Sequence, residues 1–204
     1  MVPGRIFFKR RLVGFLTVLV AAVVGIDCQA ACRRAPLGGD KAAYFPAMAK
    51  RMAAVHGIGM KKIVQKGNYA GGGFSIVWYR FGTEQENEDA TGIKISDDPA
   101  PGAVGPLMFL GDNSQANLDR MRTLTAATVS YFKHIDESQI APEIDAMLKK
   151  VVAAEPKKDD VLTDYWKNST KPVAQHQWGN VYVDMPTSPQ VLNAVSVTIG
   201  GPCK

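Results

Sequence analysis

The stretch Phe74–Phe81 constrains the fold more strongly than any other part of the chain. Its residues, Phe-Ser-Ile-Val-Trp-Tyr-Arg-Phe, are mostly aromatic or β-branched, and glycines stand on both sides. This composition and these boundaries predict a β-strand. Alternate residues of a strand point to opposite faces, so Phe74, Ile76 and Trp78 share one face. We expect that face to be the one buried in the core.

Further strands are predicted on both sides of this one. Shorter apolar or alternating segments indicate strands near 61–66 and 93–96. Two further segments near the C-terminus, 178–185 and 191–199, are predicted to form a hairpin. The acidic stretch Glu84–Asp89 is interpreted as a solvated loop, because charged side chains gather there without an apolar pattern.

Between these strands the apolar pattern changes to the period of a helix. Apolar residues recur every three or four positions over 116–134 and 142–155, and again over 46–56. Asn113 or Ser114 can cap the first of these helices, and prolines begin the other two. The order helix, strands, helices, strands predicts an α+β fold with a mainly antiparallel sheet and helices packed on one face. The expected core comprises Phe74, Ile76, Trp78, Leu118, Met121, Phe132, Leu148 and Val181.

The N-terminus carries a targeting pattern. Four basic residues precede Leu12–Ile26, a run without charge, and small residues follow up to Cys32. A basic head, a short apolar core and a small-residue exit are typical of an export signal. We therefore divide the chain into a signal peptide or N-terminal anchor at 1–30, a linker at 31–45 and a single α+β domain at 46–204.

Three fates of the signal remain open. A peptidase can cut after Ala30, Cys32 can become the lipidated first residue of a lipoprotein, or the segment can stay as an anchor. The apolar run gives a helix of roughly 22 Å, which is short for a bilayer core of about 30 Å. We favour cleavage after Ala30, which leaves the mature protein in the periplasm. A lipidated or retained segment would hold it at the membrane, facing the periplasm.

The cysteines lie only at the two ends of the chain, at Cys28, Cys32 and Cys203. Disulfides persist in the compartments that exported proteins reach. We therefore expect a Cys32–Cys203 bridge that ties the termini of the mature chain together. Lipidation of Cys32 would exclude this bridge.

Charge gives no support for a nucleic-acid partner. The formal net charge is +5, and it falls to about +2 without the first thirty residues, which hold four basic residues and one acid. The remaining lysines are scattered, whereas nucleic-acid binding needs a dense basic face. We expect membrane contact only through the N-terminal segment or a lipid.

No motif predicts catalysis, a metal or a cofactor. Ser130 and Lys133 match the Ser-x-x-Lys pattern of penicillin-binding enzymes, but they lie at a helix end and the partner motifs are missing. The acidic residues of 84–89 lack the spacing of a calcium loop. The three histidines are far apart in sequence. We expect no catalytic residue and no cofactor.

An aromatic group before the last hairpin offers candidate interface residues, namely Tyr165, Trp166, His176 and Trp178. Aromatic side chains often anchor interfaces, but they also fill cores, and we favour core packing. The sequence predicts an exported bacterial envelope protein without an evident catalytic site. We expect it to bind another envelope protein as an inhibitor, an immunity protein or an assembly accessory. The alternatives are a small exported hydrolase or a small-ligand-binding domain.

Overall fold

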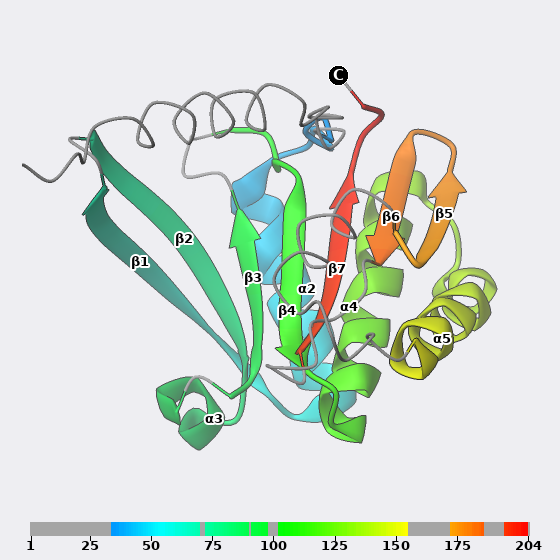
Figure 1. Cartoon of the computed structure of the whole chain (residues 1–204), viewed down its shortest axis with the longest axis horizontal. Helices are drawn as coiled ribbons and strands as arrows, with labels where there is room; N and C mark the ends of the chain where they lie inside the picture. The colour runs from blue at the N-terminus through cyan, green and yellow to red at the C-terminus, as the bar shows by residue number, and fades with distance from the viewer. Residues whose placement is uncertain are drawn as a thin grey trace, which may run out of the picture. The chain divides into compact units, whose positions relative to one another are not determined.

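The computed structural model describes residues 34–69, 72–89, 91–97, 102–154, 172–185 and 194–203. Its strands form one antiparallel sheet in the order β1-β2-β3-β4-β7-β6-β5 (Figure 1). The strands are β1 (Gly59–Tyr69), β2 (Gly72–Gly82), β3 (Ile93–Asp97), β4 (Leu107–Asp112), β5 (Ala174–Trp178), β6 (Val181–Met185) and β7 (Ala194–Gly200). The helices are α2 (Lys41–His56), α3 (Glu84–Asp89), α4 (Gln115–Lys133) and α5 (Glu137–Ala153).

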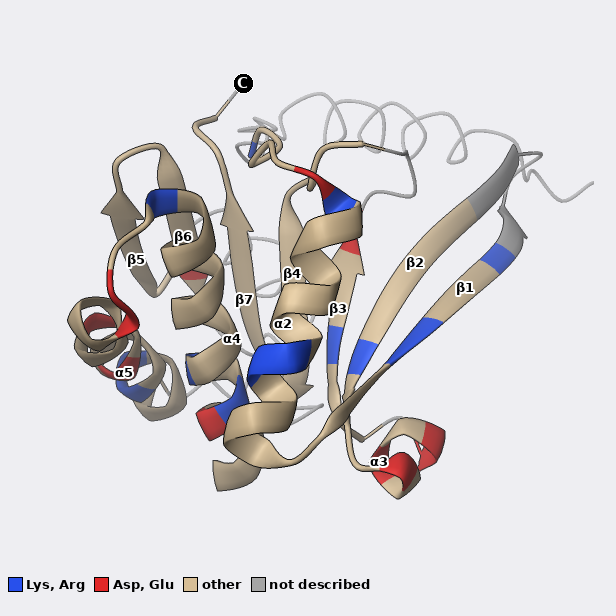
Figure 2. Cartoon of the chain, turned by 180° about the vertical axis from the view of Figure 1, so that it is seen from behind, with Lys and Arg blue, Asp and Glu red and all other residues tan. Residues whose placement is uncertain are grey.

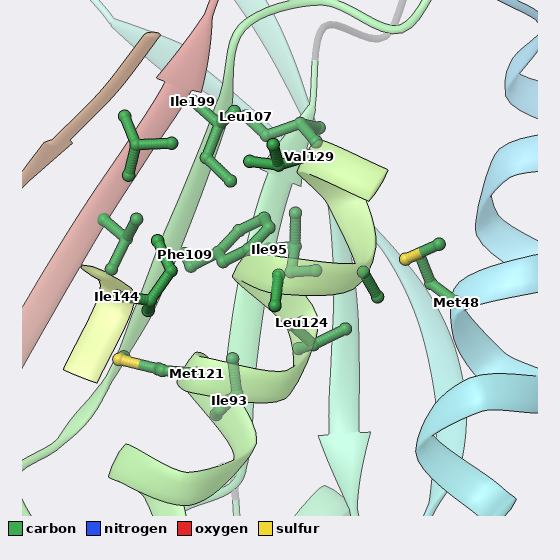
Figure 3. Packing of buried hydrophobic residues seen from close by; sticks show 14 of the residues in the cluster. Met48, Ile93, Ile95, Leu107, Phe109, Met121, Leu124, Val129, Ile144 and Ile199 are labelled. Atoms are coloured by element: carbon green, nitrogen blue, oxygen red, sulfur yellow. The ribbon is translucent and has the colours of Figure 1, made fainter. Parts of the chain in front are cut away.

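The three long helices α2, α4 and α5 pack on one face of the sheet. Figure 1 looks onto the opposite face, and Figure 2, turned by 180°, looks onto the helices. The predicted α+β fold with helices on one face is confirmed. Between the two layers lies one hydrophobic core, in which Phe109 of β4, Met121 of α4 and Ile144 of α5 are fully buried (Figure 3).

Both proline-containing helices begin earlier than the sequence predicts. Asp40 caps α2 by accepting a hydrogen bond from the Ala42 N–H at 2.9 Å, and Asp136 caps α5 in the same way. Pro46 and Pro142 therefore lie inside the helices, not at their first positions. The aspartate caps bind N–H groups of the first turn, and each proline then removes only one intrahelical hydrogen bond. The cap predicted for α4 is confirmed at Ser114.

Two strands and one helix were not predicted. β4 lies in a stretch that contains Gly111, and its pairing with β7 places it at the centre of the sheet. The strand expected at 178–185 is split by a tight turn, where Gly179 has φ +61°, and its first residue ends β5. The acidic stretch forms α3, which begins with a capping box in which the Thr83 N–H donates to Glu86 Oε2 at 2.7 Å.

The buried face of β2 is the one that the sequence did not predict. Val77, Tyr79 and Phe81 point to the helices and are buried, whereas Ile76 and Trp78 lie on the other face and are only partly buried. The prediction for these two residues was wrong because both faces of this strand are apolar, so alternation alone does not identify the core side. Of the other expected core residues, Met121, Leu148 and Val181 are buried, and Leu118 and Phe132 pack partly buried against the core. The side chain of Phe74 lies outside the described residues.

Candidate functional site

The face of the sheet opposite the helices is the most distinctive surface of the described part of the chain. We call it the open face, because the three long helices α2, α4 and α5 pack on the opposite face (Figure 1). An antiparallel sheet with one face on a core normally carries polar side chains on the other. Here the strand register aligns a row across all seven strands, part of which is apolar. The row consists of Ile63, Trp78, Ser96, Met108, Thr198, Asp184 and Gln175.

Trp78 is the largest side chain of this row. Its Nε1 donates a hydrogen bond to Gln65 Oε1 at 3.3 Å, which fixes the indole over the β1–β2 pair. Ile63 lies directly opposite it on β1, and Met108, on β4, is 37% exposed. These three side chains form a partly exposed apolar strip on β1, β2 and β4, with Ser96 of β3 between Trp78 and Met108. Exposed apolar surface of this kind marks interaction sites.

Next to this strip the register brings together three cations. Lys61 of β1 lies opposite Arg80 of β2, and Arg80 lies opposite Lys94 of β3. We call these residues the cation row, and the basic segments of the three strands lie side by side in Figure 2. This row could not be predicted from the sequence, because the three residues become neighbours only through strand pairing.

Arg80 is held at the centre of the cation row by α3. Its Nη1 donates to the backbone oxygen of Asn87 at 2.9 Å, and its Nε is buried without a hydrogen-bond partner among the described residues. Beside it a depression of about 500 Å³ opens between β1 and α3, lined by Gly59, Met60, Lys61, Gly82, Glu84, Asn87 and Glu88. No ion pair joins any residue of the cation row to a carboxylate in the described ranges.

At the β6–β7 end of the open face, Arg34 contacts both strands. The Arg34 guanidinium binds Asp184 of β6 through two hydrogen bonds, of 2.6 Å and 2.8 Å, and lies 4.3 Å from the centre of the Tyr182 ring. A Cβ on Gly200 would lie 2.5 Å from the Arg34 Cβ, so only glycine permits this approach. The apolar strip and the cation row lie on β1–β4, away from this contact.

Arg34 also bears on the predicted disulfide. Arg34 and Cys203 form an isolated antiparallel bridge, and Arg34 Nη1 lies 3.5 Å from Cys203 Sγ. Cys203 thus lies opposite a residue two positions after Cys32. Cys28 and Cys32 lie outside the described residues, and the Cys32–Cys203 bridge and the lipidation of Cys32 stay predictions.

The predicted interface residues divide between described and undescribed parts of the chain. His176 and Trp178 lie on β5, on the helix side of the sheet, since they pair with the buried Val183 and Val181. The His176 ring contacts the Trp178 ring, with centroids 4.2 Å apart, and its Nδ1 lies 3.3 Å from Glu143 Oε1. Trp178 packs partly buried against the core. Tyr165 and Trp166 lie outside the described residues.

A second depression, of about 570 Å³, lies among the helices α2, α4 and α5 and includes Ser130 in its lining. Arg51 binds Glu137 at 2.9 Å beside it, and Arg122 binds Asp145 at 2.7 Å. Lys133, the other member of the Ser-x-x-Lys pattern, donates to Asn180 Oδ1 at 2.9 Å, in the β5–β6 turn. The lysine that would activate the serine is therefore bound elsewhere, and the two residues do not form the catalytic arrangement.

The histidines are not brought together. His56, at the end of α2, has its Nε2 2.9 Å from Thr123 Oγ1, whereas His134 caps α4 and His176 lies on β5. Burial lowers the pKa of His56, and the positive charge of Arg120 lowers it further. Within the described ranges no group of three metal-ligating side chains occurs, and no helix there is long and apolar enough to cross a membrane.

Comparison with known proteins gives no relative. No protein family, no curated protein and no solved structure matches this chain.

Proposed function

We propose that this chain is an exported protein of the bacterial envelope that binds another protein, as an inhibitor, an immunity protein or an assembly accessory. The observation that carries the proposal is the apolar strip on the open face of β1–β4. Trp78 and Ile63 are directly opposite each other there, and Met108 extends the same row. Tryptophan is enriched among the residues that contribute most of the binding energy of an interface.

The location rests on the N-terminal pattern of a basic head followed by a short apolar run. Cell fractionation and intact mass spectrometry test it. We expect the protein in the periplasmic fraction, beginning at Ala31 and without a lipid. A diacylglycerol adduct on Cys32 would replace the cleaved form with the lipoprotein alternative, and a cytoplasmic location would refute export.

Binding is tested by comparing two variants of the mature domain as baits in envelope extract. Trp78→Ala removes the centre of the apolar strip, and Val152→Ala removes an exposed side chain, 50% accessible, from α5 on the other side of the sheet. We expect the wild type and Val152→Ala to retain the same partner and Trp78→Ala to lose it. Circular dichroism shows whether both variants are folded. Retention of the partner by a folded Trp78→Ala protein would refute the proposed site.

A further inference from the structure

The cation row is an unusual arrangement for a free protein. Lys61, Arg80 and Lys94 are directly opposite one another on three neighbouring strands, and they share the open face. Like charges at directly opposite positions of an antiparallel pair destabilise the pairing. A row of three therefore repels itself unless anions lie close to it.

Three carboxylates around the sheet are bound by cations outside the cation row. Glu86 of α3 binds Arg120 at 2.9 Å, and the buried carboxylate of Asp97 forms an ion pair with Lys41 at 2.7 Å. Asp184 is taken by Arg34 at 2.6 Å. Glu84 and Glu88 line the depression beside Lys61 without an ion pair to it, so within the described residues the central Arg80 and Lys94 have no anionic partner.

The cation row lies next to the apolar strip, which can bind an apolar side chain of a partner. Trp78 lies two positions from Arg80 on the same face of β2, and Ile63 lies two positions from Lys61 on β1. Arginine and tryptophan are both enriched at protein interfaces, and here the two residue types are neighbours. A partner that fits this surface therefore presents carboxylates beside an apolar side chain.

Resting on the proposed protein-binding function, we propose that the partner docks an acidic helix across β1, β2 and β3, with its carboxylates on the cation row. Neighbouring strands are about 4.8 Å apart, so the three cations follow one another at that spacing across the sheet. The Cβ atoms of residues three and four positions apart on a helix are about 5–6 Å apart, close to this spacing. Alternate residues of an extended segment are about 6.6 Å apart and fit less well.

Synthetic peptides with a fluorescent label serve as probes. The first carries glutamates at positions i, i+4 and i+7 beside a leucine stripe, and the second has the same composition in scrambled order. We expect the patterned peptide to bind the mature domain more tightly than the scrambled one, with an affinity that falls as salt concentration rises. Equal binding of both peptides would overturn the helical partner. Tighter binding of a single-stranded oligonucleotide than of either peptide would refute the proposal that the partner is an acidic protein.

Matched variants separate this inference from the proposed function. Arg80→Glu and Lys94→Glu should each weaken binding of the patterned peptide about tenfold or more, because they place a carboxylate against a carboxylate. Lys66→Glu makes the same charge change on β1, at an exposed position of the opposite face, and should leave the affinity unchanged. If Trp78→Ala loses the envelope partner while both charge-reversal variants retain it, the partner does not bind through an acidic helix. The proposal that the open face binds a protein would then still hold.

A measurement on the free protein completes the test. Lys94→Gln removes one repelling charge, so we expect the thermal midpoint in low salt to rise, and the rise to shrink in high salt. A lower midpoint in Lys94→Gln would show that the cation row supports the fold and would overturn its assignment to a partner.

Discussion

Leu148 tests whether α5 packs on the sheet as the structure shows. Its side chain is 5% exposed and belongs to the core cluster. Replacement by alanine removes three carbons, which corresponds to about 2.4 kcal/mol of lost burial at about 0.8 kcal/mol per carbon. The remaining cavity adds a further cost, so we expect Leu148→Ala to lower the free energy of unfolding by about 3–4 kcal/mol, inside the usual range of about 2–5 kcal/mol.

The matched control is Val152→Ala, one helical turn further along α5. Val152 is 50% exposed. Alanine favours a helix over valine, and surface substitutions usually change stability by no more than about 0.5 kcal/mol. We therefore expect Val152→Ala to stay within about 0.5 kcal/mol of the wild type.

Urea unfolding followed by far-ultraviolet circular dichroism measures both variants. The slope of the free energy against urea should stay the same, because neither substitution changes the surface exposed on unfolding to a large extent. A Leu148→Ala protein within about 0.5 kcal/mol of the wild type would refute the reasoning. It would show that α5 does not bury this face in solution.

Three further predictions concern charged groups and cysteines. Because burial lowers the pKa of His56, only the unfolded chain takes up a proton there as the pH falls below about 6.5, the ordinary pKa of histidine. Stability is therefore complete above that pH and decreases below it, and His56→Gln should flatten this part of a stability-against-pH curve measured by urea unfolding. Asp184→Ala leaves the buried Arg34 charge unpaired and should cost about 3–5 kcal/mol in the same assay, and an unchanged midpoint would contradict the buried pair. If Cys32 and Cys203 are bonded, neither reacts with a thiol reagent in the native, unreduced mature protein, whereas both react after reduction and unfolding.

The fold class could be predicted from the sequence because the apolar period changes clearly along the chain. The helices at 115–133 and 137–153 have long periodic stripes, and Phe74–Phe81 has the composition of a strand. Which side of that strand faces the core could not be predicted. Both Trp78 and Tyr79 are large aromatic residues. In the structure Phe45 of α2 packs on Tyr79, with ring centroids 3.5 Å apart, so Tyr79 lies on the face that α2 covers.

The candidate site was missed for a related reason. Lys61, Arg80 and Lys94 are far apart in sequence, and nothing local to any of them indicates a common row. Their alignment depends on the register of β1 on β2 and of β2 on β3, which a shift of one residue would destroy. A charged residue inside a strong apolar strand, as at Arg80, was the available signal. It marks a position that either faces water or meets a partner.

The pairing of β4 with β7 has a consequence for the order in which this protein matures. The strands β4 (Leu107–Asp112) and β7 (Ala194–Gly200) pair at the centre of the sheet, and α4, α5, β5 and β6 lie between them in the sequence. Until the last strand arrives, β4 has a free edge with unpaired N–H and C=O groups, which other chains can pair with. Before β7 pairs with it, this edge of β4 is therefore a site where the chain can aggregate. A chaperone that binds the β4 edge would protect it during this interval, and slow docking of β7 would prolong the exposure.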